Sequence, residues 1–123
     1  SQILSFDYDC TSGDISGRRQ FLDWSSNQGV PDGLAVDAEG YVWSAIWNGG
    51  CIVRITPDGT VDERIPTPVP RPSSLTFGGP DGSTIYITSA LSNGTTAVEQ
   101  PEGAIYKFDA SVVGGPWFRS DIE

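Results

Sequence analysis

Turn-forming residues divide this chain into short apolar runs, and this spacing restricts the possible folds more than any other feature. Runs rich in Val, Ile, Tyr, Phe and Trp are separated by Gly, Pro, Asp and Asn at intervals of roughly ten residues. Helical periodicity is nearly absent. The pattern predicts an all-β protein with antiparallel strands.

The clearest unit lies between Leu34 and Ile65. Alternation of apolar residues predicts four strands in this unit, which are Leu34–Val36, Tyr41–Ile46, Cys51–Thr56 and Val61–Ile65. The turns between them are short, as in hairpins that join neighbouring antiparallel strands. The unit is therefore predicted to be a four-stranded meander.

A second copy of this unit follows along the chain. Its predicted strands are Ser74–Phe77, Thr84–Ser89 and Ala104–Asp109, with a long loop at 90–103 and a weak fourth strand near Trp117–Arg119. Leu34 and Leu75 take equivalent places and lie 41 residues apart. That distance matches the roughly 40 to 50 residues of a β-propeller blade.

The whole chain is predicted to be one partial β-propeller domain, residues 1–123, with about two and a half four-stranded blades. Its first segment, Leu4–Asp7, resembles the third strand of a preceding blade, which gives a blade part at 1–24 and blades at 33–66 and 73–119. A propeller closes only with about four to eight blades. Two arrangements stay open: the polypeptide continues upstream, or a homodimer completes a six-bladed ring.

Composition limits the chemistry. The 16 acidic and 7 basic residues give a net charge of −9, which argues against nucleic acid or an anionic membrane as a partner. Histidine is absent, which excludes a Ser-His-Asp triad, a Cys-His dyad and a histidine-ligated zinc site within this chain. Cys10 and Cys51 lack metal-site spacing and are expected to be ordinary strand or turn residues. Chemistry must rest on carboxylates, amides, hydroxyls or a bound ion.

No membrane segment or signal peptide is recognisable. Apolar runs are too short to cross a membrane, and the first residues alternate as a strand does. We therefore expect a cytoplasmic protein with no membrane partner. The sequence contains no methionine, so we expect a processed, truncated or partial chain.

Pro-Asp-Gly occurs three times, with aspartates at positions 32, 58 and 81, and turn formation explains the motif at any of them. Loops of a blade alternate between its two faces. Asp32 precedes a first strand, whereas Asp58 and Asp81 belong to turns on the opposite face. Only Asp32 is therefore expected at the start of an inner strand, where a carboxylate can face a central cavity.

Four further residues are expected on the same face as Asp32 and are candidates for substrate contact: Asn48, Arg71, Ser73 and Ser74. Turn formation is an alternative for Asn48, because Asn-Gly is a preferred hairpin dipeptide. It is also an alternative for the segment that contains the two serines. Trp43 and Trp47 lie on one side of their strand and are expected to pack between blades.

The sequence resembles the senescence marker protein 30, gluconolactonase and luciferin-regenerating enzyme family over nearly its whole length, specifically the C-terminal half of that family. The best-matched stretch runs from Pro31 to Gly59, and it is continued by residues 70–81 and 85–90. Segments near Phe6 and after Gln100 also fit.

The resemblance implies a six-bladed propeller that holds one divalent cation, calcium or alternatively zinc, and hydrolyses sugar-type lactones or related esters. Asp32 matches the family's aspartate ligand in the Pro-Asp-Gly motif and could also act as a general base. The family's glutamate and asparagine ligands, and its substrate-contacting Arg and Asn pair, have no counterpart in this sequence. The alternative is a non-catalytic propeller segment for binding or self-assembly.

Overall fold

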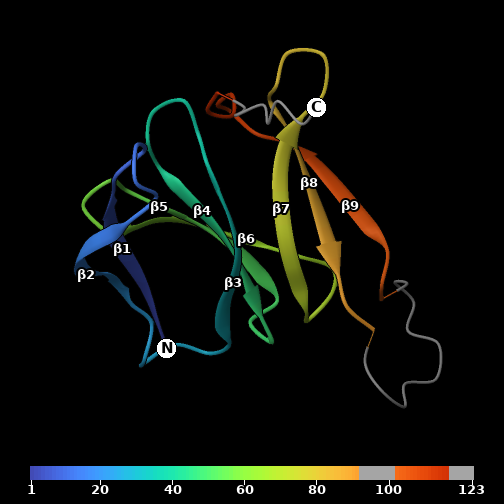
Figure 1. Ribbon diagram of the computed structural model, residues 1–123. Coiled ribbons are helices and arrows are strands. Elements are labelled where there is room, and N and C mark those ends of the chain that lie inside the picture. The colour runs from blue at the N-terminus through green and yellow to red at the C-terminus, as the bar shows by residue number, and fades with distance from the viewer. Residues whose placement is uncertain (92–101, 117–123) are drawn as a thin grey trace.

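The computed structural model describes residues 1–91 and 102–116. Throughout these residues the chain forms strands and turns, and no helix among them is long and apolar enough to cross a membrane. Three antiparallel sheets follow one another along the chain and lie side by side (Figure 1). The all-β prediction is therefore confirmed.

The first sheet has two strands, the second has four and the third has three, each in sequence order. Their bounds are β1 Gln2–Tyr8, β2 Ile15–Asp23, β3 Val30–Val36, β4 Val42–Trp47, β5 Cys51–Ile55, β6 Val61–Pro66, β7 Pro72–Gly78, β8 Thr84–Ser89 and β9 Ile105–Asp109. Strands β3 and β7 are edge strands that contact each other, and we call them the inner strands.

The strands differ from the predicted ones mainly at the inner strands and at β2. Strands β3 and β7 begin earlier than expected, at Val30 and Pro72. A proline near the start of an edge strand is tolerated, because its missing N–H faces no partner. The pattern did not predict β2 as a strand. The expected strand at 117–119 and most of the loop 90–103 lie outside the described residues.

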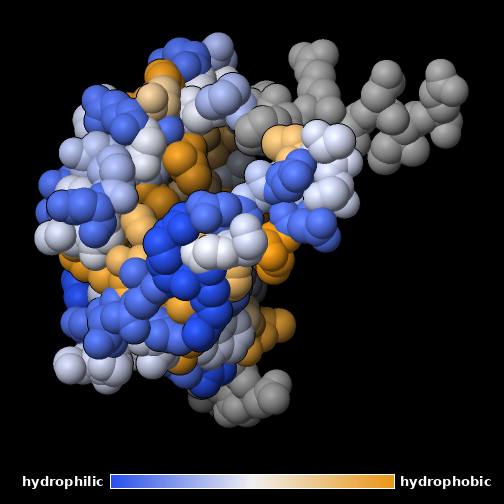
Figure 2. All heavy atoms as spheres, turned by 60° about the vertical axis from the view of Figure 1, so that its left-hand side comes forward, coloured by the Kyte–Doolittle hydropathy of each residue, from blue (hydrophilic) through white to orange (hydrophobic). Residues whose placement is uncertain are grey.

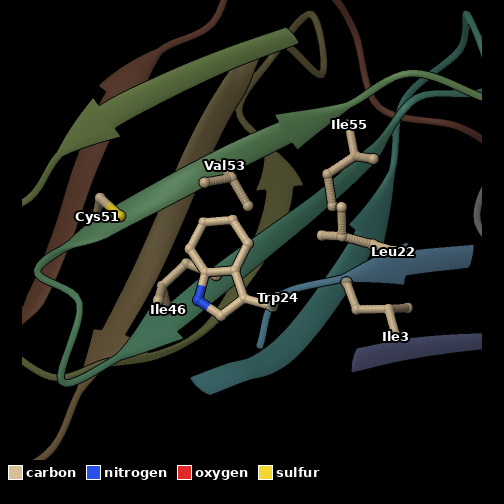
Figure 3. Packing of buried hydrophobic residues seen from close by; sticks show 7 residues of the cluster. All are labelled: Ile3, Leu22, Trp24, Ile46, Cys51, Val53 and Ile55. Atoms are coloured by element: carbon tan, nitrogen blue, oxygen red, sulfur yellow. The ribbon is translucent and has the colours of Figure 1, made fainter. Parts of the chain in front are cut away.

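Two apolar cores hold the sheets face to face. The first core lies between the first and second sheets and consists of Ile3, Leu22, Trp24, Ile46, Cys51, Val53 and Ile55 (Figure 3). Trp24 is 1% exposed, and its indole Nε1 donates a hydrogen bond to the carbonyl oxygen of Gln28 at 3.1 Å. Its one polar group is thus satisfied while its ring fills the core.

The second core joins the second and third sheets through Trp43, Ala45, Ile52, Leu75, Phe77, Ile85 and Ile87. Trp43 is 2% exposed and packs edge-on against Phe77, with ring centroids 5.7 Å apart. Trp47 is only half-buried, so the two tryptophans do not share one environment. Successive sheets packed in this way are the arrangement of propeller blades.

One face of β3 carries exposed apolar side chains. Leu34 and Val36 are 49% and 51% exposed. These side chains line an open cavity together with Phe77 of β7 and Gly115. Figure 2 shows apolar residues, in orange, in a hollow between polar parts of the surface and in separate patches lower on the same face.

Candidate functional site

The sheets have two ends with different contents. The end where β3 and β7 begin, which we call the leading end, carries residues 28–32, 47–50 and 67–73 and lies at the bottom of Figure 1. The far end carries the turns 37–41, 56–60 and 79–83. The Pro-Asp-Gly motifs of Asp58 and Asp81 therefore lie at the far end, and that of Asp32 lies at the leading end, as the sequence predicted.

Asp32 lies in a β-bulge of the inner strand. Pro31 pairs with Ile46, but the next paired residue of β3 is Leu34, so the register shifts across Asp32. A bulge bends a strand and redirects its side chains, and bulges are frequent beside active sites. The Asp32 side chain is exposed at this bulge.

The three Pro-Asp-Gly aspartates differ in their partners. Asp58 accepts a hydrogen bond from the Thr56 hydroxyl, and Asp81 accepts one from the Ser83 hydroxyl at 2.8 Å. These bonds lower the pKa of each turn aspartate. Asp32 accepts no hydrogen bond and forms no ion pair within residues 1–91 and 102–116. Its carboxylate is the one of the three with both oxygens free of hydrogen bonds from described residues, whereas Asp58 and Asp81 each use Oδ1.

The same bulge recurs in the next inner strand. Pro72 pairs with Ser89, and the register shifts before Ser74, which places Ser73 in the bulge. Ser73 lies 41 residues after Asp32, the repeat distance of the two blades. Its hydroxyl lies 2.9 Å from the Thr88 hydroxyl, and either oxygen can be the donor.

The two bulges touch each other. A Cβ atom added to Gly33 would lie 2.3 Å from Ser74 Oγ and 2.6 Å from Ser74 Cα. Only a residue without a side chain fits between the inner strands here. Asp32 and Ser73 each directly precede one member of this contact, so the two residues belong to adjoining bulges.

Asn48 and Arg71 meet at the rim of the leading end. Arg71 Nε donates a hydrogen bond to Asn48 Oδ1 at 2.9 Å, and the guanidinium carbon lies 5.9 Å from the centroid of the Trp47 ring. Asn48 has φ +57°, the left-handed conformation that Asn tolerates in tight turns. Its carbonyl oxygen accepts a hydrogen bond from Gln28 Nε2 at 3.2 Å.

The side-chain oxygens at the leading end are of the types that bind a hard divalent cation. Carboxylate, hydroxyl and amide oxygens are the ligands that Ca²⁺ prefers, and it takes six to eight of them. In the part of the chain that the structure describes, no three His, Cys, Asp or Glu side chains come together as a metal-binding group. Asp32 can therefore supply one charged ligand, and a complete carboxylate set is not formed by these residues.

A second aspartate, Asp37, is the buried polar centre of the far end, and the sequence pattern did not single it out. Its side chain is fully buried and accepts hydrogen bonds from Trp43 Nε1 at 2.9 Å and from Arg54 Nη2 at 2.9 Å. The backbone N–H groups of Glu39 and Tyr41 also donate to it, at 3.0 and 2.9 Å. The arrangement is a closed network that leaves no carboxylate oxygen free.

Opposing effects set the pKa of Asp37. Burial alone would raise it, but the hydrogen bonds from Trp43 and Arg54 and the positive charge of Arg54 outweigh burial, and the pKa lies below its ordinary value. Burial alone would lower the pKa of Arg54, but its hydrogen bonds to Asp37, Glu39 and Asp62 and the charge of Asp37 raise that pKa above its ordinary value. Both groups stay ionised, as a structural ion pair requires.

A cavity of about 660 Å³ lies along the far halves of the inner strands, not at Asp32. Its walls are mostly apolar and include Leu34, Val36 and Phe77. Asp37 also borders it, but the oxygens of Asp37 are already occupied. The Thr76 hydroxyl in its lining donates to the Phe77 carbonyl oxygen at 3.4 Å, and none of the predicted site residues lines the cavity.

The sequence is similar to that of known proteins. Residues 1–91 match the family described as SMP-30/Gluconolactonase/LRE-like region. The chain is 35% identical to pentonolactonase XacC of Haloferax volcanii over 98% of its own length and 44% of that protein. It is 38% identical to regucalcin of Xenopus laevis over 93% of its own length and 40% of that protein.

Solved structures agree with this relationship. The calcium-binding protein regucalcin from Agrobacterium tumefaciens superposes with a TM-score of 0.84 at 29% identity, over 97% of this chain and 42% of that one. A luciferin-regenerating enzyme superposes with a TM-score of 0.80 at 27% identity, over 93% of this chain and 39% of that one. The fold is therefore a partial β-propeller.

The chain spans less than half the length of the relatives it matches. The match covers most of its own residues, including the inner strand β3 with Asp32 and the contacts at Asn48 and Arg71. The chain belongs to the SMP-30/gluconolactonase/LRE-like family.

Proposed function

We propose that this chain is a segment of a metal-dependent hydrolase of sugar-type lactones or related esters, in which Asp32 is a metal ligand and general base. One observation carries the proposal: Asp32 lies on a bulge at the start of an inner strand with no partner in the described chain, whereas Asp58 and Asp81 are bonded within their own turns. The relationship to a pentonolactonase supports the same class of substrate.

Asp32 would hold the cation through a carboxylate oxygen, with further ligands supplied by water or by residues outside this chain. A bound divalent cation, calcium in the first place or zinc, would polarise the lactone carbonyl and lower the pKa of a nearby water. The name of the Agrobacterium relative, a calcium-binding regucalcin, supports calcium.

Asp32 then has a defined role in proton transfer. Its free carboxylate oxygen takes a proton from the attacking water as the water oxygen bonds to the carbonyl carbon. The ring ester C–O bond breaks, and the proton passes to the departing ring oxygen. Ser73 and Ser74, on the adjoining bulge, would orient ring hydroxyls, and the contact of Ser73 with the Thr88 hydroxyl supports this role for Ser73.

The test is lactone hydrolysis with a matched set of substitutions. Proton release from gluconolactone is measured in a pH-stat with Ca²⁺ or Zn²⁺ present, for the unmodified chain and for Asp32→Asn, Asp58→Asn and Asp81→Asn. We expect Asp32→Asn to lower kcat/KM by about 100-fold or more, as loss of a general base does. The other two variants change the same tripeptide at the far end and should keep full activity. Undiminished turnover by Asp32→Asn contradicts the proposal.

A second candidate function is a non-catalytic segment for binding or self-assembly. The exposed apolar face of β3, with Leu34 and Val36 about half exposed, favours it, because such a face is normally covered. The two-stranded first sheet also leaves one edge of β1 without a partner strand in the described chain. A homodimer, or further polypeptide upstream, would cover both surfaces.

Light scattering and equilibrium dialysis separate the two candidates. A chain that forms a stable dimer but binds neither Ca²⁺ nor Zn²⁺ supports the assembly function. Binding of Ca²⁺ or Zn²⁺ by the chain, with the binding lost in Asp32→Asn, supports the hydrolase function.

A further inference from the structure

We propose that Arg71 binds a carboxylate group, so that the lactone accepted at this site carries a carboxylate in addition to its ring ester. The inference deepens the proposed hydrolase function and rests on it for the word lactone. Recognition of a carboxylate by Arg71 itself is independent of turnover.

The guanidinium of Arg71 is held by one edge only. Its Nε donates to Asn48 Oδ1 at 2.9 Å, and its guanidinium carbon lies 5.9 Å from the centroid of the Trp47 ring at the end of β4. A guanidinium carries five N–H donors, so four remain on the two terminal nitrogens. Within residues 1–91 and 102–116 these nitrogens have no hydrogen-bond or ion-pair partner. Two coplanar N–H donors without a partner match the two oxygens of a carboxylate.

Four described basic side chains form no ion pair: Arg71 is half-buried, and Arg18, Arg64 and Lys107 are exposed. Arg19 pairs with Asp7 at 2.7 Å, and Arg54 contacts three carboxylates, those of Asp37, Glu39 and Asp62. Arg71 forms no ion pair with any described residue, although it is half-buried. Its charge is thus held at the rim without being neutralised by the chain itself.

The Arg71 side chain is not needed to join the loops around it. Backbone hydrogen bonds already connect them, from Gly50 N to the Pro70 oxygen and from Ala90 N to the Arg71 oxygen, both at 3.1 Å. Asn48 accordingly acts as a positioning residue: its amide oxygen is used by Arg71 Nε and fixes which edge of the guanidinium is presented.

Strand geometry relates Arg71 to the reacting position. Arg71 directly precedes β7 and lies two residues before Ser73, so it is on the rim side of the bulge. Ser73 in turn adjoins the Gly33–Ser74 contact beside Asp32. A ligand whose ester carbonyl meets Asp32 would extend its opposite end toward Arg71. A carboxylate at that end is what the free donors would recognise.

The binding test uses the chain without added metal. Gluconate and its uncharged counterpart glucitol are titrated, and the Arg71 Nε–Hε signal is followed by NMR. We expect saturable shifts with gluconate and none with glucitol. Arg71→Gln should weaken gluconate binding about tenfold or more. Arg18→Gln, which removes an exposed arginine on β2, should leave it unchanged.

Two further variants separate recognition from charge. Arg71→Lys keeps the charge but removes the planar pair of donors, and it should bind nearly as weakly as Arg71→Gln. Asn48→Gly preserves the left-handed backbone while removing the amide, so it should weaken gluconate binding by a smaller factor. Equal binding of gluconate and glucitol, full binding by Arg71→Gln, or no binding of either compound overturns the proposal.

A kinetic comparison then tests the substrate class. Arg71→Gln should raise KM for glucarolactone, which carries a free carboxylate, by a larger factor than KM for gluconolactone. Equal KM changes for the two lactones overturn the inference even if Asp32→Asn abolishes turnover. Loss of the Arg71-dependent binding and failure of the hydrolase proposal are therefore seen in different experiments.

Discussion

Strand β3 has an aspartate near each end, and the two are used in opposite ways. Asp32, at the leading end, is exposed and accepts no hydrogen bond from any described residue. Asp37, just beyond the other end, is 2% exposed and accepts hydrogen bonds from two backbone N–H groups and two side chains. The surrounding donors, not the residue type, decide whether a carboxylate stabilises the fold or remains available to a ligand.

The cost of removing a carboxylate from water explains this difference between Asp37 and Asp32. A buried carboxylate loses its hydration and stabilises the protein only when paired and fully hydrogen-bonded. An exposed carboxylate keeps its hydration and costs the fold nothing, so its oxygens can exchange water for a cation or a proton. Asp37 meets the first condition and Asp32 the second.

The largest expected effect comes from truncating the buried aspartate. Asp37→Ala leaves Arg54 and the Trp43 indole without their shared acceptor, and removal of one partner of a buried ion pair costs about 3 kcal/mol or more. Asp32→Ala should leave the free energy of unfolding unchanged within error. Urea denaturation of both variants measures the difference, and Trp43→Phe supplies a milder variant if Asp37→Ala does not fold. Equal losses for Asp32→Ala and Asp37→Ala would show that the comparison is wrong.

A smaller effect is expected where the leading end itself is tightly packed. Gly33→Ala places a Cβ within 2.6 Å of the Ser74 backbone, so the inner strands must separate. Such overpacking costs about 1 to 3 kcal/mol. The control is Gly13→Ala, whose Cβ meets nothing within 4 Å and which therefore reports only strain at positive φ. If Gly33→Ala unfolds at the same urea concentration as the unmodified chain, the close contact of β3 and β7 is not present in solution.

The smallest expected effect is the pH dependence of the free energy of unfolding that Asp37 causes. The folded pKa of Asp37 is lowered, so its contribution to stability is complete above the unfolded pKa of about 3.9 and is lost as the pH falls through the lower folded value. Asp37→Asn cannot ionise and should show a flatter decline in the urea midpoint below about pH 4. Parallel curves for Asp37→Asn and the unmodified chain would show that Asp37 does not cause the loss of stability in acid.

The strands that could be predicted from the sequence were those whose apolar residues are buried in a core. Strands β4 and β5 supply residues to both cores, and their apolar runs marked them in the sequence. Strand β2 is the outer member of its sheet, and only Leu22 along it is buried, so its polar sequence carried no strand signal. Tertiary position, and not local propensity, makes that segment a strand.

The candidate site was predictable in its location but not in its detail. The alternation of loops placed Asp32, Asn48 and Arg71 at one end. The bulge around Asp32 and the Asn48–Arg71 hydrogen bond depend on register between strands and could not be predicted from local pattern. Asp37 was hidden for a similar reason, since its donor Arg54 lies 17 residues away and reaches it through the β4–β5 pairing.

The recurrence of one bulge in β3 and β7 bears on how such a repeat protein can diverge. The two bulges share their preceding proline and their register shift, yet one presents an acid and the other a hydroxyl. Neither Asp32 nor Ser73 belongs to a core, so exchange of either side chain leaves the packing between sheets intact. Duplicated repeats can therefore keep one backbone and acquire different side chains at the bulge through single substitutions. Specificity can then change without a loss of stability.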